Sequence, residues 1–178
     1  WPERGEHMVQ PYLLPAGGEK AHLLRLRFRI PSEIPGGPLR LGLEQPELAS
    51  LTLNGTHVPM QPGGWYVDRL IRTVPLPPLR PGENELRADI RFGPRTNVEN
   101  FYLLGSFGVK VAGAHAAVTA APERLVFGDI VPQGLPFYGG TVTLQCPFSL
   151  PGPVEEAAVA IPHFTAPVVA VHMDGKRA

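Results

Sequence analysis

The chain has 178 residues, enough for one large domain or two small ones, and its 16 basic and 16 acidic side chains give a formal net charge of zero. A neutral chain has no overall attraction for nucleic acid or an anionic membrane, and no run approaches the roughly 18 apolar residues of a membrane span. The hydrophobic share of 43% excludes disorder. We therefore expect a soluble protein with neither nucleic acid nor membrane as a partner, and the single cysteine leaves its compartment open.

The 22 prolines and 20 glycines divide the chain into short elements and leave little room for helices of three turns. Residues 22–30 alternate between apolar and mostly arginine side chains, a period of two that is typical of a strand with one buried face. The same alternation returns at residues 39–43, 51–53 and 86–92. The fold class is therefore predicted to be all-β.

Two turns are readable between these strands. Asn54-Gly55 follows an apolar strand and predicts a tight hairpin, because primed turns need positive φ at both central residues. Residues 81–84, Pro-Gly-Glu-Asn, predict a turn that leads into the strand at 85–92.

A weak but gapless internal similarity appears when the chain is shifted by 120 positions along itself. Chance gives some matches between alternating patterns, but here strand spacing and turn position agree at one offset, which favours two duplicated sandwiches. The matched pairs are Leu24 with Leu144, Phe28 with Phe148, Ile30 with Leu150, Leu39 with Val159, Leu41 with Ile161, Leu51 with Val171, Leu53 with Met173, and Asn54-Gly55 with Asp174-Gly175.

The similarity predicts a first β-sandwich domain at residues 1–112, a linker at 113–124 and the N-terminal half of a second sandwich at 125–178. Val118 and residues 125–127 are alternatives for added edge strands. A half-sandwich exposes its inner faces, so we expect the parent chain to continue past Ala178, or the first domain or another chain to complete the sheet. The start, Trp1-Pro2, has no signal-peptide pattern and fits a processed chain or a fragment of a longer one.

Several stretches resemble the non-catalytic, C-terminal β-sandwich regions of large glycoside-hydrolase-like proteins, the α-L-rhamnosidase-like proteins among them. The stretches are residues 63–68, 81–86, 92–109, 133–142 and 171–176. The resemblance implies a jelly-roll, galactose-binding-like fold and an accessory region that braces or shapes a neighbouring catalytic domain of the same protein. It implies that the chain is not an enzyme by itself, although its parent protein is one.

Seven residues form a candidate carbohydrate site. Sugars bind to aromatic faces and to Asn, Asp and Arg side chains, so a lectin-like carbohydrate-binding module is the alternative function. In the competing interpretation Trp65 fills the sandwich, and Arg95 with Asn97 caps a loop or contacts a neighbouring domain. The seven candidates are Trp65, Tyr66, Asp68, Arg95, Asn97, Asn100 and Tyr102.

No catalytic residue, metal site or cofactor is predicted. Ser106 lacks the glycine spacing of a nucleophile elbow, and the six histidines show no zinc-type spacing. Glu83 and Glu85 are spaced like a glycosidase pair but follow a turn beside no aromatic cluster, which favours solvated carboxylates. A structural Ca²⁺ on loop oxygens such as those of Asp68 or Asn97 stays open, although no ligand-rich loop supports it.

Two further interpretations concern strand faces. Cys146 alternates in phase with Leu144 and Phe148, which predicts a buried core thiol. The arginines of residues 22–30 form a basic stripe without interleaved aromatics, which predicts a solvated or domain-contacting face. The sequence names neither the sugar nor the reaction of an attached catalytic domain.

Overall fold

The computed structural model describes residues 21–93, 95–161, 164, 166 and 168–177. Within these residues it contains no α-helix, and no helix able to cross a membrane, so the all-β prediction is confirmed. The N-terminal stretch without a signal-peptide pattern lies outside the described residues.

The elements are β1 (His22–Ser32), β2 (Leu39–Leu43), a one-turn 3-10 helix η2 (Pro46–Leu48), β3 (Ala49–Leu53), β4 (Thr56–Val58), β5 (Trp65–Tyr66), β6 (Asp68–Leu76), β7 (Gly82–Phe92), β8 (Tyr102–Gly105), β9 (Gly108–Ala112), β10 (His115–Thr119), β11 (His172–Met173) and β12 (Lys176–Arg177).

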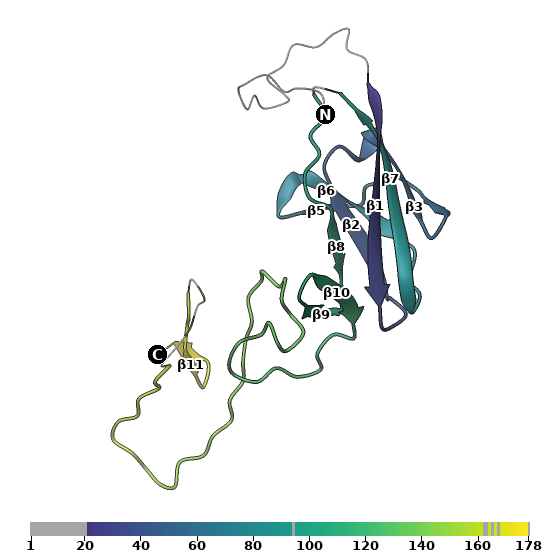
Figure 1. The fold of residues 1–178 in the computed structure, drawn as a ribbon. Helices are drawn as coiled ribbons and strands as arrows, with labels where there is room; N and C mark the ends of the chain where they lie inside the picture. The colour runs from purple at the N-terminus through teal and green to yellow at the C-terminus, as the bar shows by residue number, and fades with distance from the viewer. Residues whose placement is uncertain (1–20, 94, 162–163, 165, 167, 178) are drawn as a thin grey trace.

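Two sheets build the sandwich (Figure 1). The larger has the strand order β4-β3-β7-β1-β10-β9, and the smaller has the order β5-β6-β2-β8. β7 lies between β1 and β3 and is antiparallel to both. β10 is parallel to β1 but pairs with it only where Ser32 meets Val118, so the rest of this edge of β1 carries no strand among the described residues.

A leucine-rich core joins the two sheets. Leu41 and Val74 come from the smaller sheet, Leu51 and Leu86 from the larger, and none of the four is more than 2% exposed. The outer arginines of β1 are exposed, as the alternation predicts. The inner residues of β1 from Leu24 to Ile30 are only half-buried, whereas those of β7 from Asn84 to Ile90 are buried, because one edge of β1 lacks a neighbouring strand among the described residues.

Both predicted turns are confirmed. Asn54 and Gly55 connect β3 to β4 with φ of 52° and 80°, the positive values that a tight hairpin requires. Gly82 has a φ of 94° where the chain turns into β7. Left-handed backbone of this kind costs glycine nothing, because glycine has no Cβ.

Asn84, fully buried on β7, holds this end of the sandwich together. Its Oδ1 accepts hydrogen bonds from the side-chain amide of Asn54 (2.8 Å) and the backbone N–H of Arg80 (3.0 Å). Its Nδ2 donates to the backbone carbonyls of Arg80 (2.8 Å) and Ile30 (3.2 Å). A buried amide is tolerated only when its hydrogen-bonding groups have partners, and Asn84 meets this condition.

The C-terminal third has little regular structure. Between residues 120 and 171 the described residues form no strand, and β11 and β12 then pair as a hairpin through Asp174-Gly175. The prediction of a buried Cys146 is wrong, because its segment pairs with no strand and the thiol is exposed.

Part of the predicted linker belongs to the sandwich. β10 lies within residues 113–124 and adds Val118, 5% exposed, to the core. Of the two alternatives for an added edge strand, Val118 lies in β10, between β1 and β9, and residues 125–127 form no strand. The remaining domain boundaries, and the second sandwich, stay predictions.

Candidate functional site

The structure divides the seven candidate residues between separate places. Tyr66 and Tyr102 lie together and, with Asn100, line a wide cleft. Asn97 lies in a tight loop whose small pocket Asn100 also lines. The remaining three, Trp65, Asp68 and Arg95, line neither space.

The two tyrosines form a tilted aromatic pair. Their ring centroids are 5.3 Å apart, although β5 and β8 are the two outer strands of the smaller sheet. Gly42, on the intervening strand β2, leaves room for Tyr102 because it has no side chain. A Cβ at this position would lie 3.3 Å from Ile71 Cγ2 and 3.4 Å from Tyr102 Cβ. The pair therefore offers a half-buried aromatic surface of two tilted rings.

The turn between β5 and β6 exposes apolar side chains. Trp65 is 58% exposed, so it does not fill the sandwich, and Val67 and Leu70 are exposed still further. Val67 has a φ of 60°, a strained conformation for a β-branched residue. Asp68 Oδ1 accepts a hydrogen bond from the Leu70 N–H (2.7 Å), which fixes one oxygen of this carboxylate within the turn.

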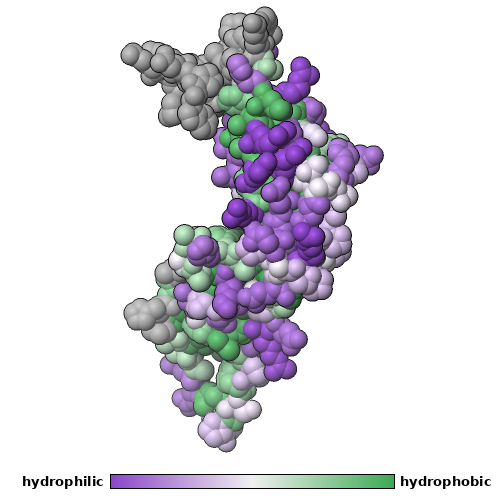
Figure 2. All heavy atoms as spheres, turned by 45° about the vertical axis from the view of Figure 1, so that its right-hand side comes forward, coloured by the Kyte–Doolittle hydropathy of each residue, from purple (hydrophilic) through white to green (hydrophobic). Residues whose placement is uncertain are grey.

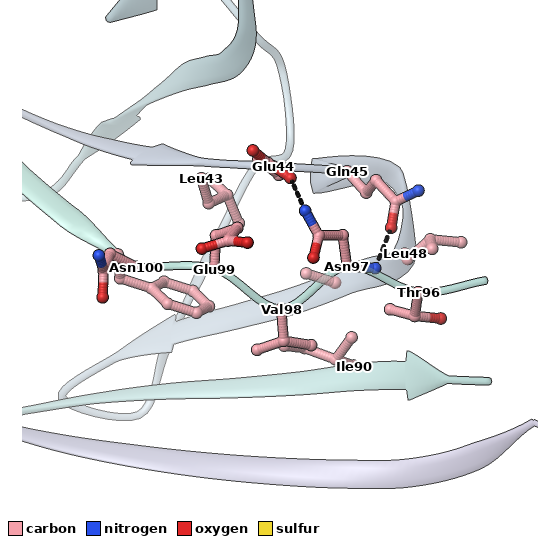
Figure 3. Close-up of a pocket in the computed structure, with 12 residues that line it drawn as sticks. Leu43, Glu44, Gln45, Leu48, Ile90, Thr96, Asn97, Val98, Glu99 and Asn100 are labelled. Atoms are coloured by element: carbon pink, nitrogen blue, oxygen red, sulfur yellow. Dashed lines mark hydrogen bonds between the residues drawn. The ribbon is translucent and has the colours of Figure 1, made fainter. Parts of the chain in front are cut away.

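Asn97 is hydrogen-bonded to the segment that follows β2 (Figure 3). Its backbone N–H donates to Gln45 Oε1 (3.0 Å), and its side-chain Nδ2 donates to the Glu44 carboxylate. Thr96 accepts from the Gly93 N–H (2.9 Å) and closes the other end of the loop. The pocket beneath has a free volume of about 10 Å³, room for one water and not for a sugar ring.

The wide cleft, of about 1030 Å³, opens beside the free edge of β8. One wall consists of β8 together with β10 and the end of β1, and the other of residues 134–140, including Phe137 and Tyr138. A hydrogen bond from the Val109 N–H to the Gly134 carbonyl (2.8 Å) holds this second wall against β9. The sequence analysis did not select Phe137 and Tyr138 as site residues. The signal that could have identified them is an adjacent aromatic pair between glycines.

Charged groups gather on strands β1 and β7 of the larger sheet. Figure 2 shows hydrophilic side chains over the six-stranded sheet, where β1 and β7 present arginines and carboxylates to solvent. Asp89 accepts two hydrogen bonds from Arg25 (2.8 and 2.9 Å) and one from Arg87 (3.3 Å). The bonds from Arg25 hold the pKa of the Asp89 carboxyl below its usual value and raise the pKa of Arg25.

The carboxylates considered for catalysis lie on this same solvated face. Glu83 and Glu85 are exposed on β7, and Glu85 lies opposite Arg29 of β1. Among the described residues no three His, Cys, Asp or Glu side chains gather as a metal site. Asp68 uses one carboxylate oxygen within its turn, and Asn97 donates its Nδ2 to Glu44.

A scan against protein-family models and searches of the curated proteins and the solved structures found nothing that matches this chain.

Proposed function

We propose that this chain is a non-catalytic, jelly-roll and galactose-binding-like β-sandwich region of a glycoside-hydrolase-like protein, and that it braces a neighbouring catalytic domain. The carbohydrate context rests on the resemblance of residues 63–68, 81–86, 92–109, 133–142 and 171–176 to such regions. A resemblance of this kind supports a function only by association, so a surface of the molecule must support the function as well.

The wide apolar cleft supports the bracing role. It lies beside β8, the last strand of the smaller sheet among the described residues, and it presents the aromatic side chains of Phe137 and Tyr138. Phe137 is 73% exposed. Exposed aromatic side chains are enriched at surfaces that another domain covers.

The test compares two substitutions in the protein that contains the adjoining catalytic domain. Phe137→Asp, in the cleft, is expected to lower the temperature at which that domain loses activity. Val126→Asp is the matched control, because Val126 is similarly exposed, at 69%, and does not line the cleft. Equal inactivation temperatures for both variants would refute bracing through this surface.

A lectin-like carbohydrate-binding module is the second candidate, and the aromatic surface near β5 favours it. Trp65 is exposed at the edge of the sheet that carries the Tyr66–Tyr102 pair, and aromatic faces bind the C–H patches of sugars. Here Trp65→Ala is expected to abolish glycan binding on an array, whereas Phe127→Ala, at a similarly exposed site, leaves it intact. An array on which the unmodified chain binds nothing rules this candidate out.

A further inference from the structure

β1 is paired along its full length on one side only. On that side all of its residues lie opposite β7. On the other side β10 meets β1 at a single residue pair, Ser32 with Val118, and Figure 1 shows β10 only near that end of β1. Residues 22–31 therefore face no strand of the described residues along this side, which we call the free edge of β1. A strand directs its backbone N–H and C=O groups alternately to its two sides, so every second residue here presents both groups to the free edge.

The apolar face of β1 is incompletely covered beside the free edge. Its inward residues belong to the core but are half-buried, whereas the inward residues of β7, one strand further into the sheet, are buried. Phe28 stacks against Phe101 with ring centroids 5.0 Å apart and is still half-buried. A further strand beside β1 would complete this cover, because its own inward side chains would lie next to those of β1.

The outward face of β1 is basic. Arg25, Arg27 and Arg29 are exposed at alternate positions along the free edge. Arg25 is bound to Asp89 of β7, but Arg27 lies opposite another arginine, Arg87. Unpaired backbone groups, half-covered apolar side chains and a row of positive charge thus lie along the same edge.

The charge of the free edge decides which strand fits it. A second copy of β1, added with its apolar side chains inward, would place its arginines beside those of the first, and like charges on neighbouring strands are unfavourable. β7 shows the pattern that does fit, because its outward Glu85 and Asp89 lie opposite arginines of β1. A strand in which acidic residues alternate with apolar residues complements both faces of β1.

We propose that the free edge of β1 binds an extended segment of another polypeptide in which acidic and apolar residues alternate. The segment adds to the larger sheet as a strand beside residues 23–31. Its backbone pairs with the N–H and C=O groups of the free edge, its apolar side chains cover Leu26 and Phe28, and its carboxylates lie beside the arginines. In strand addition the backbone supplies affinity and the alternate side chains supply specificity. This inference does not rest on the carbohydrate function proposed above.

The probe is a fluorescently labelled peptide of about nine residues, a usual strand length, in which glutamate alternates with valine. Two control peptides separate charge from strand pairing. The first has lysine in place of glutamate. The second keeps the glutamates but has every backbone nitrogen methylated, which removes its hydrogen-bond donors. Fluorescence anisotropy with the whole chain is expected to show binding roughly tenfold tighter for the probe than for either control. Equal binding of the methylated peptide would show attraction by charge alone and overturn strand addition.

Arg27→Glu tests the same idea from the side of the protein. The new carboxylate would lie opposite Arg87, so a like-charge pair becomes an opposite-charge pair and the sandwich should stay folded. The variant is expected to bind the glutamate peptide roughly tenfold more weakly and the lysine peptide more tightly. Arg69→Glu is the matched control, because Arg69 is an exposed arginine of β6 in the smaller sheet, and it should change neither affinity. A preference for the glutamate peptide that survives Arg27→Glu contradicts the proposal.

Amide hydrogen exchange, measured by NMR, shows where the peptide binds. The probe should slow the exchange of every second amide of residues 23–31, those that face the free edge, and leave the amides of β6 unchanged. If these amides exchange slowly in the chain alone at every concentration, the edge is already covered by this chain. If they become protected as the concentration of the chain rises, the edge belongs to a second copy. Either result overturns the proposal.

Discussion

Single residues decide whether the ends of this sandwich close. Asn84 connects the β3–β4 turn, the loop before β7 and the carbonyl of Ile30 through one buried side chain. The Asn54-Gly55 turn is predictable from sequence alone, because its backbone needs positive φ at two positions and Asn-Gly is the pair that most readily supplies it. The strained φ of Val67 has no such local cause, because valine disfavours that conformation and the β5–β6 pairing imposes it.

Asn84→Ala is expected to lower the free energy of unfolding by about 3 kcal/mol, since it leaves several buried backbone and side-chain groups without partners. Urea unfolding of the whole chain measures the loss. The neighbouring exposed residue provides the control: Glu83→Gln should change stability by less than about 0.5 kcal/mol. Similar stabilities for the two variants would show that the buried network is dispensable.

At the scale of elements, β1 and β7 form the longest ladder, with eleven residue pairs from His22 with Phe92 to Ser32 with Gly82. Its outer face carries a direct Arg27–Arg87 pair, and like charges placed opposite each other are unfavourable. Asp89 offsets this repulsion by binding both Arg25 and Arg87. The carboxylate therefore stabilises the pairing of the two strands.

The effect of Asp89 should depend on pH. Arg25 lowers the folded-state pKa of Asp89, so the stabilisation is present above the unfolded-state pKa of about 3.9 and is lost as the pH falls through the lower folded value. Asp89→Asn is accordingly expected to lower the melting temperature at pH 7 and to match the unmodified protein below that folded pKa. Glu123→Gln, which removes an exposed charge outside any ion pair of the described residues, should have no such effect. A difference between Asp89→Asn and the parent that persists unchanged into acid would contradict this account.

The whole molecule combines a closed core with an open C-terminal segment (Figure 1). The sandwich buries side chains from both sheets, whereas residues 142–160 outside Val142 and Leu144 are exposed. Backbone amides exchange slowly only where they are hydrogen-bonded and covered.

Amide hydrogen exchange of the isolated chain should therefore separate the two regions. We expect β7 amides to exchange several orders of magnitude more slowly than those of residues 142–160, because only the former lie in a ladder on both sides. Mass spectrometry of peptic fragments measures both at once, and β1 provides an internal reference with one paired side. Equally slow exchange at 142–160 would mean that these residues are already paired.

The sequence by itself determined the local elements: the alternating strands, the Asn-Gly and Asp-Gly hairpins and the exposed arginines of β1 all follow from side-chain period and turn chemistry. The sequence offered Tyr66 and Tyr102 as candidates without showing that their rings pack together, that Asn97 is bound to Glu44 or that Phe137 lines the cleft. Those facts depend on which distant segments meet. Tertiary structure also decided the fate of Cys146: its alternation is that of a core strand, but burial requires a partner strand, and none lies beside it among the described residues.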